Sequence, residues 1–141
     1  MVYHHDGVRL GEDVPGKSGL LATAAGAKLA MKLPARCEGN VGIEALHTYN
    51  NAGAFRVTAL RTATPQACAG GALPPEADVT EVPGGRVVDT LWGTHASLGH
   101  LIDLDFKGLV GAECGWLVIE LVEPPTPRDG MKVKLLSVSF L

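Results

Sequence analysis

The sequence lacks the features that mark several large classes of protein. It contains no run of about 18 apolar residues, which a membrane-spanning helix requires. Lysine and arginine number 12 against 15 aspartates and glutamates, which gives a net charge of −3. No cluster of basic residues offers the positive patch that nucleic acids require. We therefore expect neither membrane insertion nor a nucleic-acid partner.

Cysteine is scarce, and its spacing excludes the common zinc motifs. Cys37, Cys68 and Cys114 are too far apart to form a Cys-x-x-Cys unit, so we expect no structural zinc. Cys37 and Cys68 both lie in turn-like surroundings, where a disulfide would join two loops. A Cys37–Cys68 bridge is therefore the predicted pairing. The alternative is that all three cysteines are buried as small hydrophobic residues.

Complete catalytic motifs are also missing. Ser97 lies between His95 and His100, but no Gly-x-Ser-x-Gly elbow presents it as a nucleophile. A metal bound by His95, His100 and Asp103 is conceivable, although the His-x-His pair of a cupin enzyme is absent. We expect no catalytic residues. A hydrolase that uses either Ser97 with His95 or such a metal is the less favoured alternative.

Short strand-like segments fill the chain where long helices are lacking. Hydrophobic residues make up 46% and charged residues 19% of the sequence, which is a globular composition. The 18 glycines and nine prolines are scattered, as they are in proteins with many strands and turns. Residues 1–18 are predicted to be a polar lead-in with turns at 4–7 and 14–17. A single domain follows over residues 19–141.

Period-two alternation and turn residues divide this domain into strands. Asn and Gly residues separate 41–49 from 54–62, which we predict to be a hairpin. Residues 19–24 and 27–33 are predicted to form another hairpin, with a helix over 20–33 as the alternative. The predicted strands are residues 19–24, 27–33, 41–49, 54–62, 77–82, 87–92, 101–106, 116–122 and 131–141.

The number and spacing of these strands indicate the fold class. Eight or nine strands, about ten residues apart, are typical of an all-β sandwich or barrel. Residues 101–106 alternate strictly between apolar and polar side chains, and we predict that Asp103 and Asp105 face outward. Residues 116–122 are almost continuously apolar, as in a strand buried on both faces. We predict an antiparallel β-sandwich or barrel of eight or nine strands.

Five segments, taken in chain order, carry a resemblance to a known family. They are GKSGLLATAAGAKLAMKL, VGIEALHTYNNAGAFRV, VDTLWGTHAS, GWLVIELV and KVKLLSVSFL. Together they resemble galactose-binding-like jelly-roll modules, in particular the non-catalytic modules that accompany SGNH/GDSL-type esterases and algal or plant surface proteins. The Gly-Asp-Ser block of the esterases is absent, and Ser18 replaces a usual proline. The matching residues are Lys17, Gly19, Leu20, Gly26, Tyr49 and Gly53.

This resemblance implies a binding role and no enzymatic activity. The implied role is that of a lectin-like, carbohydrate-binding module in a surface or extracellular protein. The alternative is a structural subunit of a large assembly that binds no small ligand. The implied partners are accordingly a glycan or neighbouring protein subunits. No apolar signal core is visible at the N-terminus, so either the protein stays inside the cell or the chain is a mature or excised domain. The expected extracellular or cell-surface location is that of a mature domain.

A few residues have the chemistry that sugar binding needs. Sugars are held by aromatic platforms together with hydrogen-bonding groups, and only 5% of the residues are aromatic. The predicted site is the loop edge near Trp92, His95 and Tyr49, where an aromatic residue at the end of a strand adjoins a polar turn. The alternative is that Trp92 is a core anchor and that the polar residues only form the turn. The predicted sugar-binding residues are Trp92, His95, Tyr49, Asn51 and Arg56.

A metal ion is the remaining cofactor to consider. Asp103 and Asp105 fall on the same face of a predicted strand, where two carboxylates suit a hard cation such as Ca²⁺. Jelly-roll modules often hold a structural calcium ion, so the resemblance favours this site. The alternative is a solvated acidic strand face. We expect no other cofactor.

Overall fold

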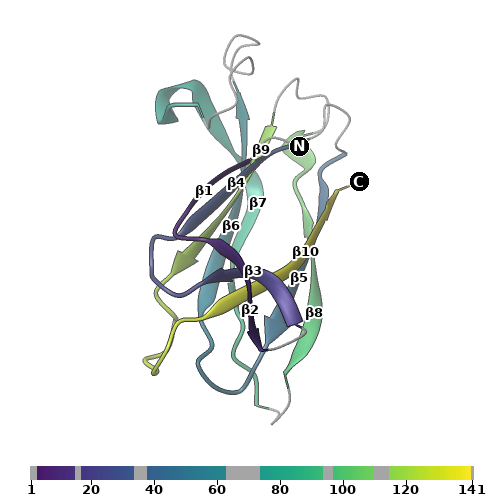
Figure 1. Ribbon diagram of the computed structural model, residues 1–141. Coiled ribbons are helices and arrows are strands. Elements are labelled where there is room, and N and C mark those ends of the chain that lie inside the picture. The colour runs from purple at the N-terminus through teal and green to yellow at the C-terminus, as the bar shows by residue number, and fades with distance from the viewer. Residues whose placement is uncertain are drawn as a thin grey trace.

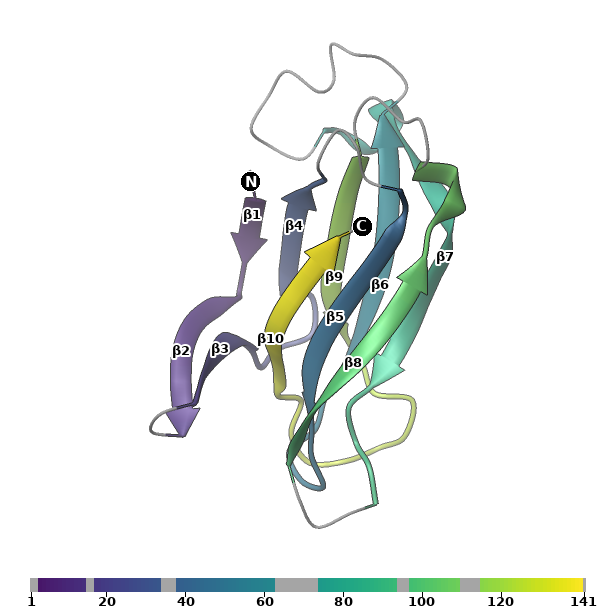
Figure 2. The same ribbon diagram turned by 90° about the vertical axis from the view of Figure 1, so that its right-hand side faces the viewer.

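The computed structural model describes residues 3–14, 17–33, 38–62, 74–93, 97–109 and 115–140. Within these residues the chain forms two antiparallel sheets of five strands each, stacked face to face (Figures 1 and 2). Sheet A contains, in spatial order, β1 (Tyr3–Asp6), β4 (Lys28–Lys32), β9 (Gly115–Val122), β6 (Ala54–Thr62) and β7 (Val79–Asp89). Sheet B contains β2 (Arg9–Val14), β3 (Lys17–Ala22), β10 (Val133–Phe140), β5 (Asn40–His47) and β8 (Leu98–Asp105).

The predicted all-β antiparallel sandwich is confirmed. Its helical content in the described residues is limited to the single turns η2 (Glu76–Asp78) and η3 (Lys107–Leu109). None of the helices found there is long and apolar enough to span a membrane. The helix alternative over residues 20–33 is wrong, because β3 and β4 occupy most of that segment.

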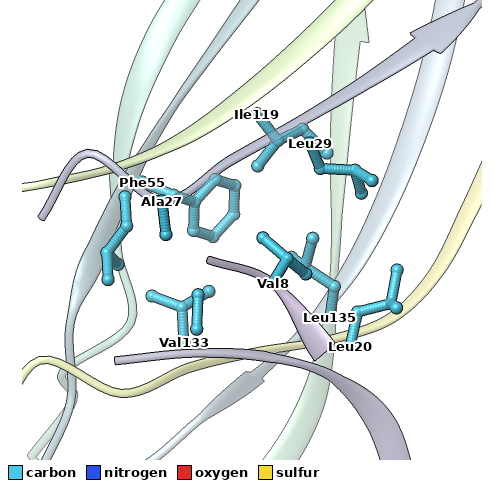
Figure 3. A pocket seen from close by; sticks show the side chains of 10 residues that line it. Val8, Leu20, Ala27, Leu29, Phe55, Ile119, Val133 and Leu135 are labelled. Atoms are coloured by element: carbon cyan, nitrogen blue, oxygen red, sulfur yellow. The ribbon is translucent and has the colours of Figure 1, made fainter. Parts of the chain in front are cut away.

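The core lies between the sheets and follows the alternation of the strands. On β8, Ile102 and Leu104 are buried while Asp103 and Asp105 are exposed, as predicted. Figure 3 shows Phe55 and Ile119 of sheet A facing residues of sheet B across a small apolar void of about 20 Å³. That volume is about one water probe, so the two sheets are closely packed.

A second, smaller apolar cluster lies on the outer face of sheet A. Trp116 is fully buried there with Ala30 and Val118, and Leu60 packs against them. The prediction that residues 116–122 form a strand buried on both faces is therefore confirmed, since Trp116 and Val118 lie in this cluster whereas Leu117 and Ile119 lie in the central core. The indole Nε1 of Trp116 is buried and has no hydrogen-bond partner among the described residues.

Both predicted hairpins are wrong in their pairing, although their strands exist. β3 pairs with β2 and β10, whereas β4 pairs with β1 and β9. Likewise β5 belongs to sheet B and β6 to sheet A. Each connection crosses from one sheet to the other, because both strands then turn their apolar sides to the shared core from opposite sides.

The lead-in and the region around residues 77–92 also differ from the prediction. The expected turn at 4–7 is wrong, because β1 occupies Tyr3–Asp6. The expected turn at 14–17 agrees with the antiparallel pairing of β2 and β3, in which Val14 lies opposite Lys17. Strands β1 and β2 raise the number in the described residues from the predicted eight or nine to ten. The predicted strands 77–82 and 87–92 are parts of one edge strand, β7, whose register shifts where it passes Gly84 and Gly85.

Candidate functional site

Three connections gather at one end of the sandwich, which we call the loop end: residues 48–53 after β5, 90–93 after β7 and 123–132 after β9. Figure 2 shows them below the sheets. Backbone hydrogen bonds join them. Thr48 N–H donates to Thr90 O over 3.0 Å, and Gly53 N–H donates to Lys132 O over 2.9 Å. The loop end is therefore a bonded unit rather than three independent turns.

A groove of about 520 Å³ runs between these connections. Tyr49 is 44% exposed there, and the apolar side chain of Leu91 is also exposed. Amide and carboxylate side chains border them. The groove is thus an open aromatic and aliphatic surface edged by planar hydrogen-bonding groups. Its lining residues are Tyr49, Asn50, Asn51, Ala52, Leu91, Arg128, Asp129 and Gly130.

Arg128, which lines the groove, contacts all three segments that surround it. Its guanidinium forms a bidentate pair with Asp89 at the end of β7, with N–O distances of 2.7 and 2.8 Å. It also donates to the carbonyl oxygen of Ala52 in the β5–β6 connection. Within its own connection it donates to the carbonyl and hydroxyl oxygens of Thr126. Only 9% of the Arg128 side chain is exposed.

This ion pair moves the pKa of both partners further from neutral pH. Hydrogen bonding from Arg128 holds the pKa of Asp89 below its ordinary value of 3.8, against the opposing effect of partial burial. The hydrogen bond to Asp89 in turn raises the pKa of Arg128. Both groups are therefore charged at neutral pH. Asp89 also accepts the backbone N–H of Leu91 over 3.0 Å, which fixes the turn after β7.

An aromatic cluster lies next to the groove, formed by His47, Trp92 and His100. The ring centroid of His47 lies 5.9 Å from that of Trp92 and 4.8 Å from that of His100. Burial lowers the pKa of His47, the nearby charge of His100 lowers it further, and the contact with Ala45 O and the charge of Asp89 oppose these effects. His47 is therefore neutral at pH 7. The cluster supports the backbone that carries Tyr49 and Leu91, because Trp92 N–H donates to Thr48 O over 3.1 Å.

The structure brings together some of the predicted sugar-binding residues. Tyr49 and Asn51 line the same groove, and Trp92 packs beside it in the aromatic cluster. Arg56 lies elsewhere: it is exposed on β6, between inward-facing Phe55 and Val57, and does not line the groove. His95 lies outside the described residues.

The catalytic alternatives gain no support from the geometry. The Ser97 hydroxyl hydrogen-bonds with the Thr48 hydroxyl at 2.9 Å. On β8, His100 shares the face of Ile102 and Leu104, whereas Asp103 is on the opposite face, so these two cannot share a metal ion. A metal site that joins His100 and Asp103 is therefore wrong.

The predicted calcium site has two carboxylates and little more. Asp103 and Asp105 share the exposed face of β8, and Asp105 lies 4.0 Å from the Lys107 ammonium. Calcium takes six to eight oxygen ligands, and the described residues contain no group of three or more His, Cys, Asp or Glu that could hold a metal. These two residues do not by themselves fit calcium. Cys37, Cys68 and Cys114, and with them the predicted disulfide, lie outside the described residues.

Sequence reasoning missed Arg128, Asp89 and Asp129 as parts of the site. Arg128 and Asp129 follow Pro124, Pro125 and Pro127 in the connection after β9, and this local sequence indicates no partner for either residue. Asp89 is 39 residues away from Arg128 in sequence. A partly buried Arg–Asp pair at that separation leaves no local pattern, so only the proximity of the two segments in the fold reveals it.

Comparisons with known proteins agree with this architecture. No protein-family model and no curated protein matches the sequence. A solved structure described as CBM28, a carbohydrate-binding module specific for non-crystalline cellulose, matches with a TM-score of 0.57 at 10% identity, over 99% of this chain and 86% of that chain. Another concerns the promiscuous specificity of carbohydrate-binding modules of the β-sandwich superfamily. It matches with a TM-score of 0.53 at 13% identity, over 100% of this chain and 54% of that chain.

The chain has the fold of β-sandwich carbohydrate-binding modules. The predicted jelly-roll module is therefore confirmed as a fold. The likeness extends over nearly the full length of this chain, including β1 and β2. At these identities it describes the backbone arrangement alone, so the function is argued from the loop end.

Proposed function

We propose that this chain is a carbohydrate-binding module whose sugar site is the loop-end groove. The observation that carries the proposal is the exposed ring of Tyr49 in one groove with Asn50, Asn51 and Asp129. An aromatic ring packs against the C–H face of a sugar, and planar amide and carboxylate groups hydrogen-bond its hydroxyls. The β-sandwich fold, which carbohydrate-binding modules share, supports the same conclusion.

The groove suits a sugar better than it suits a reactive substrate. Its apolar surface comes from Tyr49 and Leu91, and its polar edge comes from amide and carboxylate side chains that donate or accept hydrogen bonds. We therefore propose a non-catalytic, lectin-like role as a module of a surface or extracellular protein. This context rests on the resemblance to galactose-binding-like modules. A calcium ion at Asp103 and Asp105 remains a prediction that a chelator can test.

The proposal is tested by a glycan-array screen of the purified chain beside a Tyr49→Ala variant. We expect the wild type to bind a set of glycans and the variant to lose at least tenfold in affinity. Stacking of a nucleic-acid base on one aromatic side chain contributes about 1–3 kcal/mol, and we expect a similar gain when the C–H face of a sugar packs on Tyr49. Isothermal titration with the best glycan gives the dissociation constants. A repeat with EDTA reports on calcium.

The matched control is Arg56→Ala, which removes an exposed side chain that does not line the groove. This variant should bind like the wild type. Equal loss in both variants would contradict the location of the site. Absence of binding to every glycan by the wild type would contradict the proposed function.

A neighbouring protein subunit is the second candidate partner. Leu101 and Leu136 remain exposed on the outer face of sheet B, close to Gly42 and Gly99. Exposed apolar side chains on a sheet face are typical of protein contacts. If the chain binds no glycan, the partner is sought among proteins by cross-linking.

A further inference from the structure

The guanidinium of Arg128 has no hydrogen-bonding capacity left for a ligand. An arginine side chain has five N–H donors. Here Nε donates to Thr126 O, Nη1 to Asp89 and Ala52, and Nη2 to Asp89 and the Thr126 hydroxyl. These contacts engage all five. Arg128 lines the groove, but it does so as a saturated group.

The charge of Arg128 is also compensated. Asp89 holds the planar fork in a bidentate pair at 2.7 and 2.8 Å, which is the geometry by which an arginine would otherwise recognise a carboxylate or sulfate. An acidic sugar would have to displace Asp89 and leave that carboxylate unpaired. The other charged residue that lines the groove is Asp129, which is exposed and negative.

From this arrangement we propose that the groove selects uncharged glycans, and that Arg128 is a positioning residue rather than a contact for the sugar. The inference rests on the proposed function and names the substrate class of the same site. Neutral hydroxyls find amide groups at Asn50 and Asn51 and an acceptor at Asp129. A uronic acid or a sulfated sugar meets the Asp129 carboxylate and no available cation among the lining residues.

The positioning role follows from what Arg128 joins. Its contacts reach Ala52 in the β5–β6 connection, Asp89 at the end of β7 and Thr126 in the β9–β10 connection. These are the three segments that supply the walls of the groove. Together with the backbone hydrogen bonds between the connections, this side chain holds Tyr49 and Asn51 in place relative to Leu91 and Asp129.

The test compares one neutral oligosaccharide, the best binder of the glycan screen, with its counterpart oxidised at C6 to a uronic acid. Isothermal titration of the wild type should show at least tenfold weaker binding of the oxidised sugar. Asp89→Asn removes the compensating charge while keeping the shape of the side chain. It should shift the ratio of the two affinities toward the oxidised sugar, because Arg128 then carries an uncompensated charge.

Asp129→Asn provides a second variant at an exposed position, where loss of the fold is not expected. The Asp129→Asn variant should also lower the ratio of the affinity for the neutral sugar to the affinity for the oxidised sugar. The melting temperatures of the Asp89→Asn and Asp129→Asn variants show whether the fold persists. A wild type that binds the oxidised sugar as tightly as the neutral one would overturn the selection of neutral glycans. A wild type that prefers the neutral sugar, with an unchanged ratio in both variants, would overturn the role of these charges. A wild type that binds neither would overturn the proposed function itself.

Discussion

His47 is buried between Trp92 and His100 at the loop end, and this position makes stability depend on pH. Burial lowers its pKa from 6.5, and the neighbouring charges oppose one another, since His100 lowers the pKa and Asp89 raises it. The unfolded chain takes up a proton as the pH falls through about 6.5, whereas folded His47 does so only at lower pH. The stabilisation is thus complete above pH 6.5 and declines below it.

We therefore expect the free energy of unfolding to be lower at pH 5.5 than at pH 7.5, as measured by urea denaturation. A His47→Gln variant should show a smaller decline over the same interval, because it removes the titrating group. A decline of equal size in the variant would mean that groups other than His47 cause the pH dependence of stability. The Asp89–Arg128 pair acts in a separate window, because Asp89 has a lowered pKa and its contribution is lost only below about pH 3.8.

At the same scale, the site was partly predictable from the sequence. Tyr49 and Asn51 were found because aromatic and turn-forming residues adjoin in the chain, and the structure places both in the groove. Arg56 was misplaced because period-two alternation turns it outward on β6, away from the groove. Arg128 was not found, because its partners lie in three connections that only tertiary structure brings together.

At the scale of elements, the connection between β5 and β6 depends on a glycine. Gly53 donates its N–H to Lys132 O, and its carbonyl accepts hydrogen bonds from Thr90 N and Thr90 Oγ1. A Cβ at this position would overlap the carbonyl of Met131. The backbone of one connection therefore passes directly against the backbone of another, and a side chain has no room.

We expect Gly53→Ala to lower the free energy of unfolding by about 1–3 kcal/mol, the usual cost of overpacking, and to weaken glycan binding at the adjoining groove. Chemical denaturation measures the first effect and isothermal titration the second. Gly93→Ala is the matched control in the same loop end, because nothing lies within 4 Å of an added Cβ there. Equal stability losses in both variants would show that close backbone approach is not the cause.

The strands themselves were predictable, and their pairing was not. Alternation identifies which side chains of β5 and β6 face a core, but it does not say whether the two strands approach that core from one sheet or from two. Residues 50–53 contain the residues of a hairpin turn. Yet the connection uses them to cross between sheets, with Asn51 at φ 49°. Long-range pairs such as β5 with β10 decide the topology.

At the scale of the whole molecule, the two sheets are held together by their shared apolar core. Each sheet satisfies its own backbone hydrogen bonds through its strand pairs. Side chains from both sheets join one cluster that includes Phe55, Leu117 and Ile43. A sandwich of this kind should unfold as one cooperative unit, because neither sheet has another apolar face of similar size to bury.

Two leucines, one in this core and one on the surface, allow the contribution of the core to stability to be measured. Leu117 on β9 is fully buried, whereas Leu98 on β8 is 55% exposed. We expect Leu117→Ala to lower the free energy of unfolding by about 2–5 kcal/mol, and Leu98→Ala to change it by no more than about 0.5 kcal/mol. The shift in the urea midpoint measures both. Transitions followed by tryptophan fluorescence and by circular dichroism should coincide in the wild type and in both variants. Separate transitions for the two probes would mean that the sheets unfold independently, and the loop end could then not rely on both of them to hold its groove.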